Sequence, residues 1–156
     1  MKDITSLAAD LHAPVVKQRQ RAAAELGKSG SLSAIAPLAS ALCDSHPAVR
    51  CEIVQALGRL GDSDAVPALI TALEDSRPDI RCAAIAALGK IRDRAAVDPL
   101  ICCLEDKDMT VRIGAAEVLG KLGDKRAIRQ LTLRLDDPFL DVRNAAISAI
   151  SKLTKK

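Results

Sequence analysis

The sequence repeats with a period of 31 residues, and this period constrains the fold more than any other feature. We use the word column for the residues that occupy the same position in successive repeats. One pair of columns holds a branched aliphatic residue followed by arginine: Val49-Arg50, Ile80-Arg81, Val111-Arg112 and Val142-Arg143. A leucine column consists of Leu7, Leu38, Leu69, Leu100 and Leu131. A unit copied at a constant step without insertions predicts an array of like structures that stack on one another.

Each repeat contains two amphipathic helical patterns. The first has apolar residues at spacings of i, i+3, i+4 and i+7, as in Val66, Leu69, Ile70 and Leu73. The second follows a short polar turn, as in Val49 to Leu60. The expected pairs are 3–12 with 17–27, 32–43 with 48–58, 63–74 with 79–89, 94–105 with 110–120, and 125–136 with 141–153. One pair cannot bury both faces alone, so we predict an all-α fold, an α-solenoid of five helix pairs in a curved two-layer array.

Turn residues fit these boundaries. Pro47 and Pro78 suit the opening of the second helix, where a missing N–H is harmless. Its end suits either Gly61 and Gly123 or the glycine column, Gly27, Gly58, Gly89 and Gly120. The N-cap candidates for the next first helix are Asp62, Asp93 and Asp124. The expected domain is a single one, residues 1–156, with repeats at about 1–30, 31–61, 62–92, 93–123 and 124–156.

The first and last repeats differ from the inner ones. Asp10 and Arg134 stand in a column that elsewhere holds Ala41, Ala72 and Cys103. Glu25 replaces the small apolar residues of its column, Ala56, Ala87, Val118 and Ala149. Polar outer faces are what the end repeats of an array need, so we expect a complete five-repeat protein, a monomer or a weak end-to-end dimer.

Composition excludes several classes. The chain has one Phe, no Trp and no Tyr, so it lacks the aromatic platforms on which nucleic-acid bases stack. Its net charge of +3 comes from basic and acidic residues mixed along the whole length. No run approaches the roughly 18 apolar residues of a membrane span. Five cysteines without framework spacing indicate reduced thiols, and we expect a cytoplasmic protein that does not bind membranes or nucleic acid.

The unit from Val49 to Asp75 closely resembles the short HEAT-like repeat named after phycobilisome lyases, whose members include chromophore lyase subunits, regulators, hydroxylases and engineered binding scaffolds. The resemblance covers the whole chain. It implies that the second helices line a concave surface where partners dock. That surface would comprise Gln20, Arg21, Ala24, Lys28, Cys51, Glu52, Gln55, Arg59, Cys82, Ala83, Ala86, Lys90, Ile113, Gly114, Glu117, Lys121, Asn144, Ala145, Ser148 and Lys152. We predict partner contact for all of these except Ala24, Lys28, Cys51, Asn144, Ala145, Ser148 and Lys152.

Two further columns carry charge. In the first, an aspartate precedes an arginine by six residues: Asp44 with Arg50, Asp75 with Arg81, Asp106 with Arg112, and Asp137 with Arg143. The family uses such residues to tie neighbouring repeats together, so we predict a structural ladder, from which Arg19 departs because Ala13 holds the aspartate position. The second is the basic column Lys28, Arg59, Lys90, Lys121 and Lys152. It could meet an acidic partner or a phosphate backbone, but each cation also suits the end of its helix.

No catalytic or metal site is predicted. The spacing of Cys43, His46 and Cys51 fits no zinc pattern, and neither His12 nor His46 is followed by the glutamate that the family's iron hydroxylases use. We expect no cofactor. The middle of the inferred surface is small and apolar, at Cys82, Ala83, Ala86, Ile113 and Gly114, which favours a protein interface. The leading hypothesis is a non-enzymatic scaffold that binds a protein or peptide, and the alternative is a subunit of a phycobilin lyase-type complex acting on a chromophore-carrying protein.

Overall fold

Ten α-helices in five pairs make up the regular structure of the computed structural model, which describes residues 3–155. The chain forms two compact units, residues 1–91 and 92–156. Unit 1 contains α1 (Ile4–Asp10), α2 (Val16–Lys28), α3 (Ile35–Ser40), α4 (Pro47–Leu60), α5 (Val66–Ala72) and α6 (Pro78–Ile91). Unit 2 contains α7 (Val97–Cys103), α8 (Met109–Leu122), α9 (Ile128–Leu133) and α10 (Leu140–Thr154). The all-α prediction is confirmed, whereas the single domain over residues 1–156 stays a prediction.

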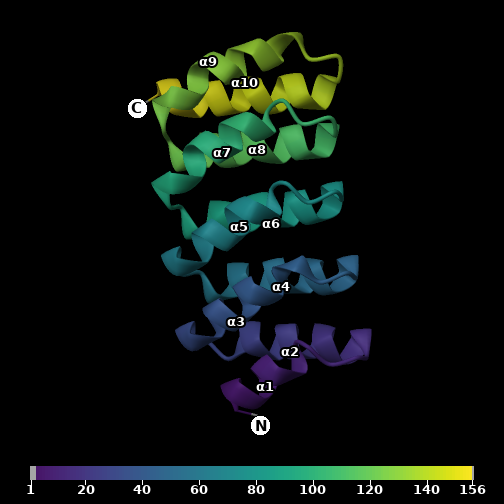
Figure 1. Cartoon of the computed structure of the whole chain (residues 1–156). Coiled ribbons are helices and arrows are strands. Elements are labelled where there is room, and N and C mark those ends of the chain that lie inside the picture. Colours follow the sequence, from purple (N-terminus) through teal and green to yellow (C-terminus); the bar gives the residue numbers. More distant parts are fainter. Residues whose placement is uncertain (1–2, 156) are drawn as a thin grey trace. The chain divides into compact units, whose positions relative to one another are not determined.

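The helices of each unit lie in two layers. In unit 1 the second helices of the pairs, α2, α4 and α6, lie side by side, and the first helices α1, α3 and α5 pack against them (Figure 1). In unit 2, α8 packs beside α10, while α7 and α9 cover them. The leucine column lies between the layers and is almost fully buried, from 4% exposed at Leu7 to 0% at Leu38, Leu69, Leu100 and Leu131. Burying every third or fourth residue of each helix provides the apolar area that holds a repeat together.

The first helices of the pairs are shorter than the sequence pattern predicts. In four repeats a 3-10 turn precedes the α-helix, at Leu32–Ala34, Ser63–Ala65, Arg94–Ala96 and Lys125–Ala127. The aspartate N-caps explain this in three of them, because Asp62, Asp93 and Asp124 accept the backbone N–H two residues later, at 2.8–3.0 Å, and so close a tight first turn. The predicted N-cap role of these aspartates is therefore confirmed.

Two glycine columns serve different purposes. Gly61 and Gly123 end α4 and α8 in the left-handed conformation, with φ of 70° and 78°. The other column lies inside the helices, where neighbouring second helices approach closely. A Cβ at Gly27 would lie 2.6 Å from Ala56 Cα, and one at Gly120 would lie 2.9 Å from Ala149 Cα. Of the two possibilities for the helix end, the structure therefore selects Gly61 and Gly123.

The last repeat does not have the polar outer surface that the end substitutions suggested. Arg134 is half-buried and folds back to donate from Nη1 to the Leu104 carbonyl at 3.1 Å. Large apolar side chains remain about half exposed in this repeat: Leu133, Phe139, Leu140 and Ile147. The guanidinium of Arg112 lies over the Phe139 ring, 5.7 Å from its centroid, and about half of each of the four side chains stays exposed. Among residues 3–155, no helix is long and apolar enough to cross a membrane.

Candidate functional site

The exposed side of the second helices in unit 1 carries a small apolar patch. We call Cys82, Ala83 and Ala86 of α6 the apolar strip. Ala86 is exposed, and Cys82 and Ala83 are half-buried. They stay accessible because they lie opposite Ile80, Ala84 and Leu88, which point into the core. The strip is therefore a shallow surface of short side chains that a partner could approach closely.

Charged and polar side chains lie on the exposed side of α6 and of its neighbour α4, and others lie on α2, which packs against α4. On α4, Arg59 Nη2 donates to Glu52, and Gln55 Nε2 donates to Cys51 Sγ at 3.4 Å. On α2, Arg21 Nε donates to Glu25 at 2.8 Å, and Gln20 is half-buried beside it. Lys90 is exposed in the last turn of α6. An apolar centre within a polar rim is the usual arrangement of a protein-binding surface.

Cys51, on the neighbouring helix α4, is not set up as a nucleophile. Burial is the main cause that raises the pKa of Cys51, and the nearby carboxylate of Asp79 raises it further. A raised pKa keeps the thiol protonated at neutral pH, and the protonated thiol is a poor nucleophile. All five cysteines lie within the described chain, and none of them forms a disulfide.

Unit 2 presents a corresponding surface on α8 and α10. Ile113 and Gly114 are half-buried, and Glu117 and Lys121 are exposed on the same side of α8. On α10 the exposed members of the inferred surface are Asn144, Ser148 and Lys152. Ala145 is an exception at 9% exposed, because α10 packs against α8 and a methyl group does not extend beyond that contact.

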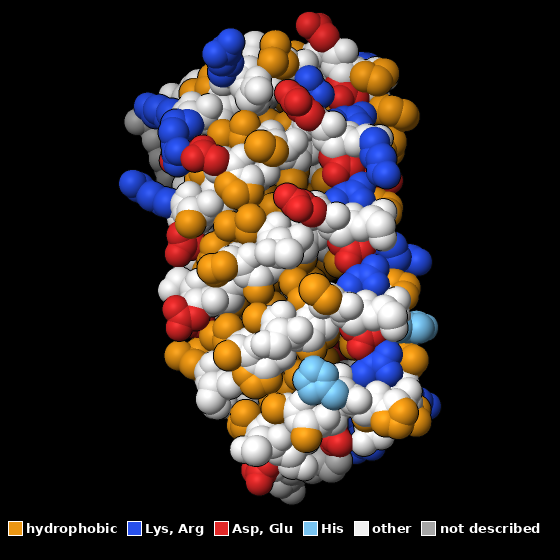
Figure 2. Space-filling view, viewed as in Figure 1, with side chains coloured by type: hydrophobic (Ala, Val, Ile, Leu, Met, Phe, Trp, Pro, Cys, Tyr) orange, Lys and Arg blue, Asp and Glu red, His pale blue; other side chains and the backbone are white. Residues whose placement is uncertain are grey.

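The arginine column makes one repeated contact, whose carboxylate comes from the following repeat. Arg19 donates from Nε and Nη2 to Asp44 at 2.6 and 3.0 Å. Arg50 donates in the same way to Asp75 at 2.6 and 3.1 Å, and Arg112 donates to Asp137 at 2.9 and 3.0 Å. In each pair the aspartate lies 25 residues after the arginine. Figure 2 shows basic and acidic side chains alternating along one edge of unit 1.

The residue six positions before each arginine supplies a backbone carbonyl. Arg50 Nη1 donates to the Asp44 carbonyl at 2.9 Å, and Arg81 Nη1 to the Asp75 carbonyl at 2.8 Å. In unit 2, Arg112 Nη1 donates to the Asp106 carbonyl at 2.7 Å. Any residue can supply a backbone carbonyl, and Arg19 Nη1 donates to the carbonyl of Ala13 at 2.9 Å. Our expectation that Arg19 departs from the ladder is therefore wrong.

Three aspartates of this ladder, Asp44, Asp75 and Asp137, have a lowered pKa, which favours the carboxylate form. Burial by itself raises the pKa of Asp44, but the hydrogen bonds from Arg19 and from the His46 N–H outweigh it and lower the pKa below its ordinary value. The same balance, with the same sign, lowers the pKa of Asp75 and of Asp137. Such ion pairs join the turn of one repeat to that of the next, which is a structural role.

The basic column lies at helix ends. Lys28, Arg59 and Lys90 occupy the last turns of α2, α4 and α6, and Lys121 and Lys152 those of α8 and α10. A cation there complements the partial negative charge of the helix terminus. This placement explains the column without a ligand.

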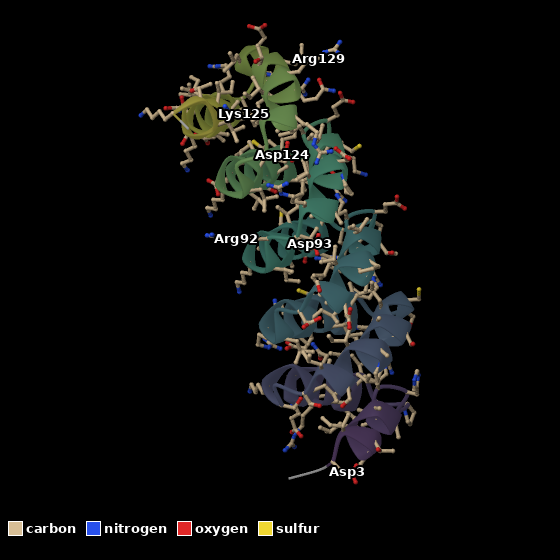
Figure 3. The ribbon with its side chains drawn as sticks, turned by 90° about the vertical axis from the view of Figure 1, so that its left-hand side faces the viewer. Asp3, Arg92, Asp93, Asp124, Lys125 and Arg129 are labelled. Atoms are coloured by element: carbon tan, nitrogen blue, oxygen red, sulfur yellow. The ribbon has the colours of Figure 1, made fainter. Side chains whose placement is uncertain are left out.

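Two hollows are also present, and the first shares Arg21 and Lys28 with the inferred surface on α2. One of about 1150 Å³ in unit 1 lies between α1 and α2, with Leu7 and Ala22 among its apolar lining. One of about 390 Å³ in unit 2 is lined in part by Arg92, Lys125 and Asp124. Figure 3 shows the Arg92 side chain extending away from its neighbour Asp93.

The structure offers no metal centre within residues 3–155, where no three His, Cys, Asp or Glu side chains lie close enough together to hold an ion. His46 instead caps α4, accepting the Ala48 N–H on Nδ1 at 3.3 Å. Sequence reasoning missed Arg92, which adopts a φ of 60° at the column position of Gly61 and Gly123. The signal was present, since an arginine in a column of turn glycines indicates a backbone under strain.

Comparison with known proteins assigns the fold. A family model described as HEAT repeats matches residues 4–79 and 66–151. The chain is similar to a chain in the structure of the complex of CpcE and CpcF of phycocyanin lyase from Nostoc sp. PCC7120, with 28% identity and a TM-score of 0.81. The similarity covers 100% of this chain and 66% of that chain, so this chain spans just under two thirds of its length.

Two more distant structures share the fold alone. A designed armadillo repeat protein in complex with the peptide (KR)4 is 20% identical with a TM-score of 0.69, over 97% of this chain and 82% of that chain. Human deoxyhypusine hydroxylase in complex with glycerol is 18% identical with a TM-score of 0.56, over 98% of this chain and 85% of that chain. No curated protein matches the sequence significantly.

Proposed function

Since the chain belongs to the HEAT-repeat family, we propose that it is a non-enzymatic scaffold that binds a protein or peptide on the exposed side of its second helices. The observation that carries this proposal is the apolar strip on α6 with its charged rim. Short side chains let a partner approach the helix backbone closely. The rim, which includes the Glu52–Arg59 pair and Lys90, offers hydrogen bonds to a partner's polar groups.

The open shape of the apolar strip favours a macromolecule over a small ligand as the partner. The strip is an open surface, whereas small-molecule sites are concave and enclose most of the ligand. Binding energy at such a surface concentrates in the few contacts at its centre. The centre in unit 1 is Ala86, which is exposed. In unit 2 its column position holds Glu117, and the apolar residue of that surface is Ile113, in the column of Cys82. Ala86 and Ile113 are therefore the positions to perturb.

The experiment is a pull-down from extracts of the native host. It compares the wild-type chain with Ala86→Glu, Ile113→Glu and the matched control Ala36→Glu, whose position is exposed on α3 in the other layer. A charge at the centre of an apolar contact must be desolvated without a partner, so the strip variants should lose the captured protein while the control keeps it. Equal capture by all four proteins would show that this side is not the interface.

A second candidate function is a subunit of a lyase-type complex of the phycobilisome-lyase HEAT-like family. It is supported by the similarity to the CpcE and CpcF complex structure over the whole of this chain. The test is co-expression with candidate chromophore-carrying proteins and a bilin, followed by absorbance spectroscopy of the purified carrier. Bilin absorbance that requires this chain supports the proposal. Its absence with every carrier contradicts it.

A further inference from the structure

Arg143, the last arginine of the ladder, makes the same kind of backbone contact as the other ladder arginines, but no carboxylate within residues 3–155 binds it. Arg143 Nη1 donates to the Asp137 carbonyl at 2.7 Å and to the Pro138 carbonyl at 3.1 Å. Arg112 is anchored in the same way to the Asp106 carbonyl at 2.7 Å, and this leaves its Nε and Nη2 to bind Asp137. The Nε and Nη2 of Arg143 have no acceptor within residues 3–155. The backbone therefore holds a guanidinium edge oriented for a planar carboxylate.

An apolar surface surrounds this edge. We call Phe139, Leu140, Arg143 and Ile147 the tail face. Phe139, Leu140 and Ile147 are 48%, 59% and 56% exposed. Ile147 belongs to the column of Ala23, Val54, Ile85 and Ala116, all of which are at most 1% exposed. In the described repeats of both units, this column is otherwise buried. The tail face thus keeps the chemistry of a contact between repeats.

We propose that the tail face binds a further helix pair of the same repeat type, whose inter-helix turn places an aspartate on Arg143. Within the chain, such aspartates have a second partner that defines the turn. Asp44 accepts the His46 N–H at 2.8 Å, and Asp137 accepts the Phe139 N–H at 3.1 Å. The partner's aspartate should likewise open its second helix. The contact would then repeat the geometry of Arg19, Arg50 and Arg112.

A second copy of this chain does not match the tail face. Its first repeat has Ala13 where the aspartate should be. It also has Glu25 at the column position of Ala56. This position lies very close to the preceding repeat, since a Cβ added to Gly27 would be only 2.6 Å from the Cα of Ala56. The tail face has Ser151 at the glycine position. A glutamate brought against this surface would lose part of its hydration, so head-to-tail stacking of identical chains is disfavoured.

The test converts the first repeat into a matching probe. The probe is this chain with Ala13→Asp, Asp10→Ala and Glu25→Ala, and with Arg143→Gln and Ile147→Lys so that its own tail cannot bind. A fluorescent label on the probe reports binding by anisotropy as the unmodified wild-type chain is added. We expect saturable binding. A reduced probe with only Ala13→Asp and Ile147→Lys serves if circular dichroism shows that the first one has lost helix.

The controls identify the occupant and the contact. On the wild-type side, Arg143→Lys keeps the charge but loses the two-pronged edge, so its affinity should fall at least about tenfold. Lys107→Gln, which removes an exposed cation in the turn before α8, should leave the affinity unchanged. Equal binding by Arg143→Lys, equal binding by a labelled chain with the native first repeat, or no binding of either probe would each overturn the proposal. The second of these results would identify another copy as the occupant.

Discussion

The ion pair between Arg112 and Asp137 offers the sharpest test of how neighbouring repeats are joined, because Arg143 is a natural control. Both arginines donate from Nη1 to a backbone carbonyl at 2.7 Å. Only Arg112 also binds a carboxylate. We therefore compare Arg112→Gln with Arg143→Gln. The difference between their effects on the free energy of unfolding measures the carboxylate contact, together with the smaller contribution of Arg112 lying over the Phe139 ring.

The magnitude follows from burial. The side chains of Arg112 and Asp137 are 8% and 2% exposed, so the pair is little screened by water. Two charge-assisted hydrogen bonds each contribute about 1.5–3 kcal/mol, and the cost of desolvating both charges offsets much of this sum. Removing Arg112 leaves Asp137 buried, with the Phe139 N–H still donating to it. We expect a loss of about 2–4 kcal/mol for Arg112→Gln and of about 1 kcal/mol or less for Arg143→Gln.

The assay is urea unfolding at neutral pH, followed by far-ultraviolet circular dichroism. Repeat arrays can unfold in steps, so the midpoint and the slope of each transition are both compared. Equal losses for the two variants would refute the reasoning, because the carboxylate would then contribute nothing beyond the carbonyl contact.

The same comparison has a defined pH dependence. Although burial raises the pKa of Asp137, the hydrogen bonds from Arg112 and the Phe139 N–H outweigh it, so the folded pKa lies below the unfolded value of about 3.9. A lowered carboxylate pKa contributes stability that is fully present above the unfolded pKa and is lost as the pH falls through the folded pKa. The extra loss in Arg112→Gln should therefore be constant above about pH 5 and shrink below about pH 4.

Three further changes have defined outcomes. Arg92→Gly should raise the stability by about 1 kcal/mol in the same urea assay, because φ of 60° strains a residue with a side chain; a decrease would contradict this. Gly27→Ala should lower it by about 1–2 kcal/mol, since the new Cβ would meet Ala56 Cα at 2.6 Å and this outweighs alanine's better helix propensity; unchanged stability would mean that the helices separate freely. Iodoacetamide should modify Cys51 more slowly than the exposed Cys102, as mass spectrometry of digested protein would show, because burial raises the Cys51 pKa; equal rates would argue against a protected thiol.

Much of the architecture was predictable from the sequence because its signals are local. The apolar spacing within each repeat, the prolines at the start of α4 and α6, and the aspartate N-caps act over a few residues, and the structure has them where the pattern predicts. The positions on the exposed side of α4 and α6 also follow from helical periodicity alone. The identity of the partner does not follow from the sequence, because helical periodicity shows which positions are exposed but not what binds to them.

The 31-residue period by itself determined the helix pairs and the columns, and the tertiary structure decided which repeats each column connects. An aspartate lies both six residues before Arg50 and 25 residues after it, and spacing alone does not distinguish these two partners. Stacking does, because it brings the turn with Asp75 against the Arg50 edge and leaves Asp44 to offer its carbonyl. For the same reason the unmatched member of the ladder is Arg143, whose partner depends on a surface that packs against the last repeat.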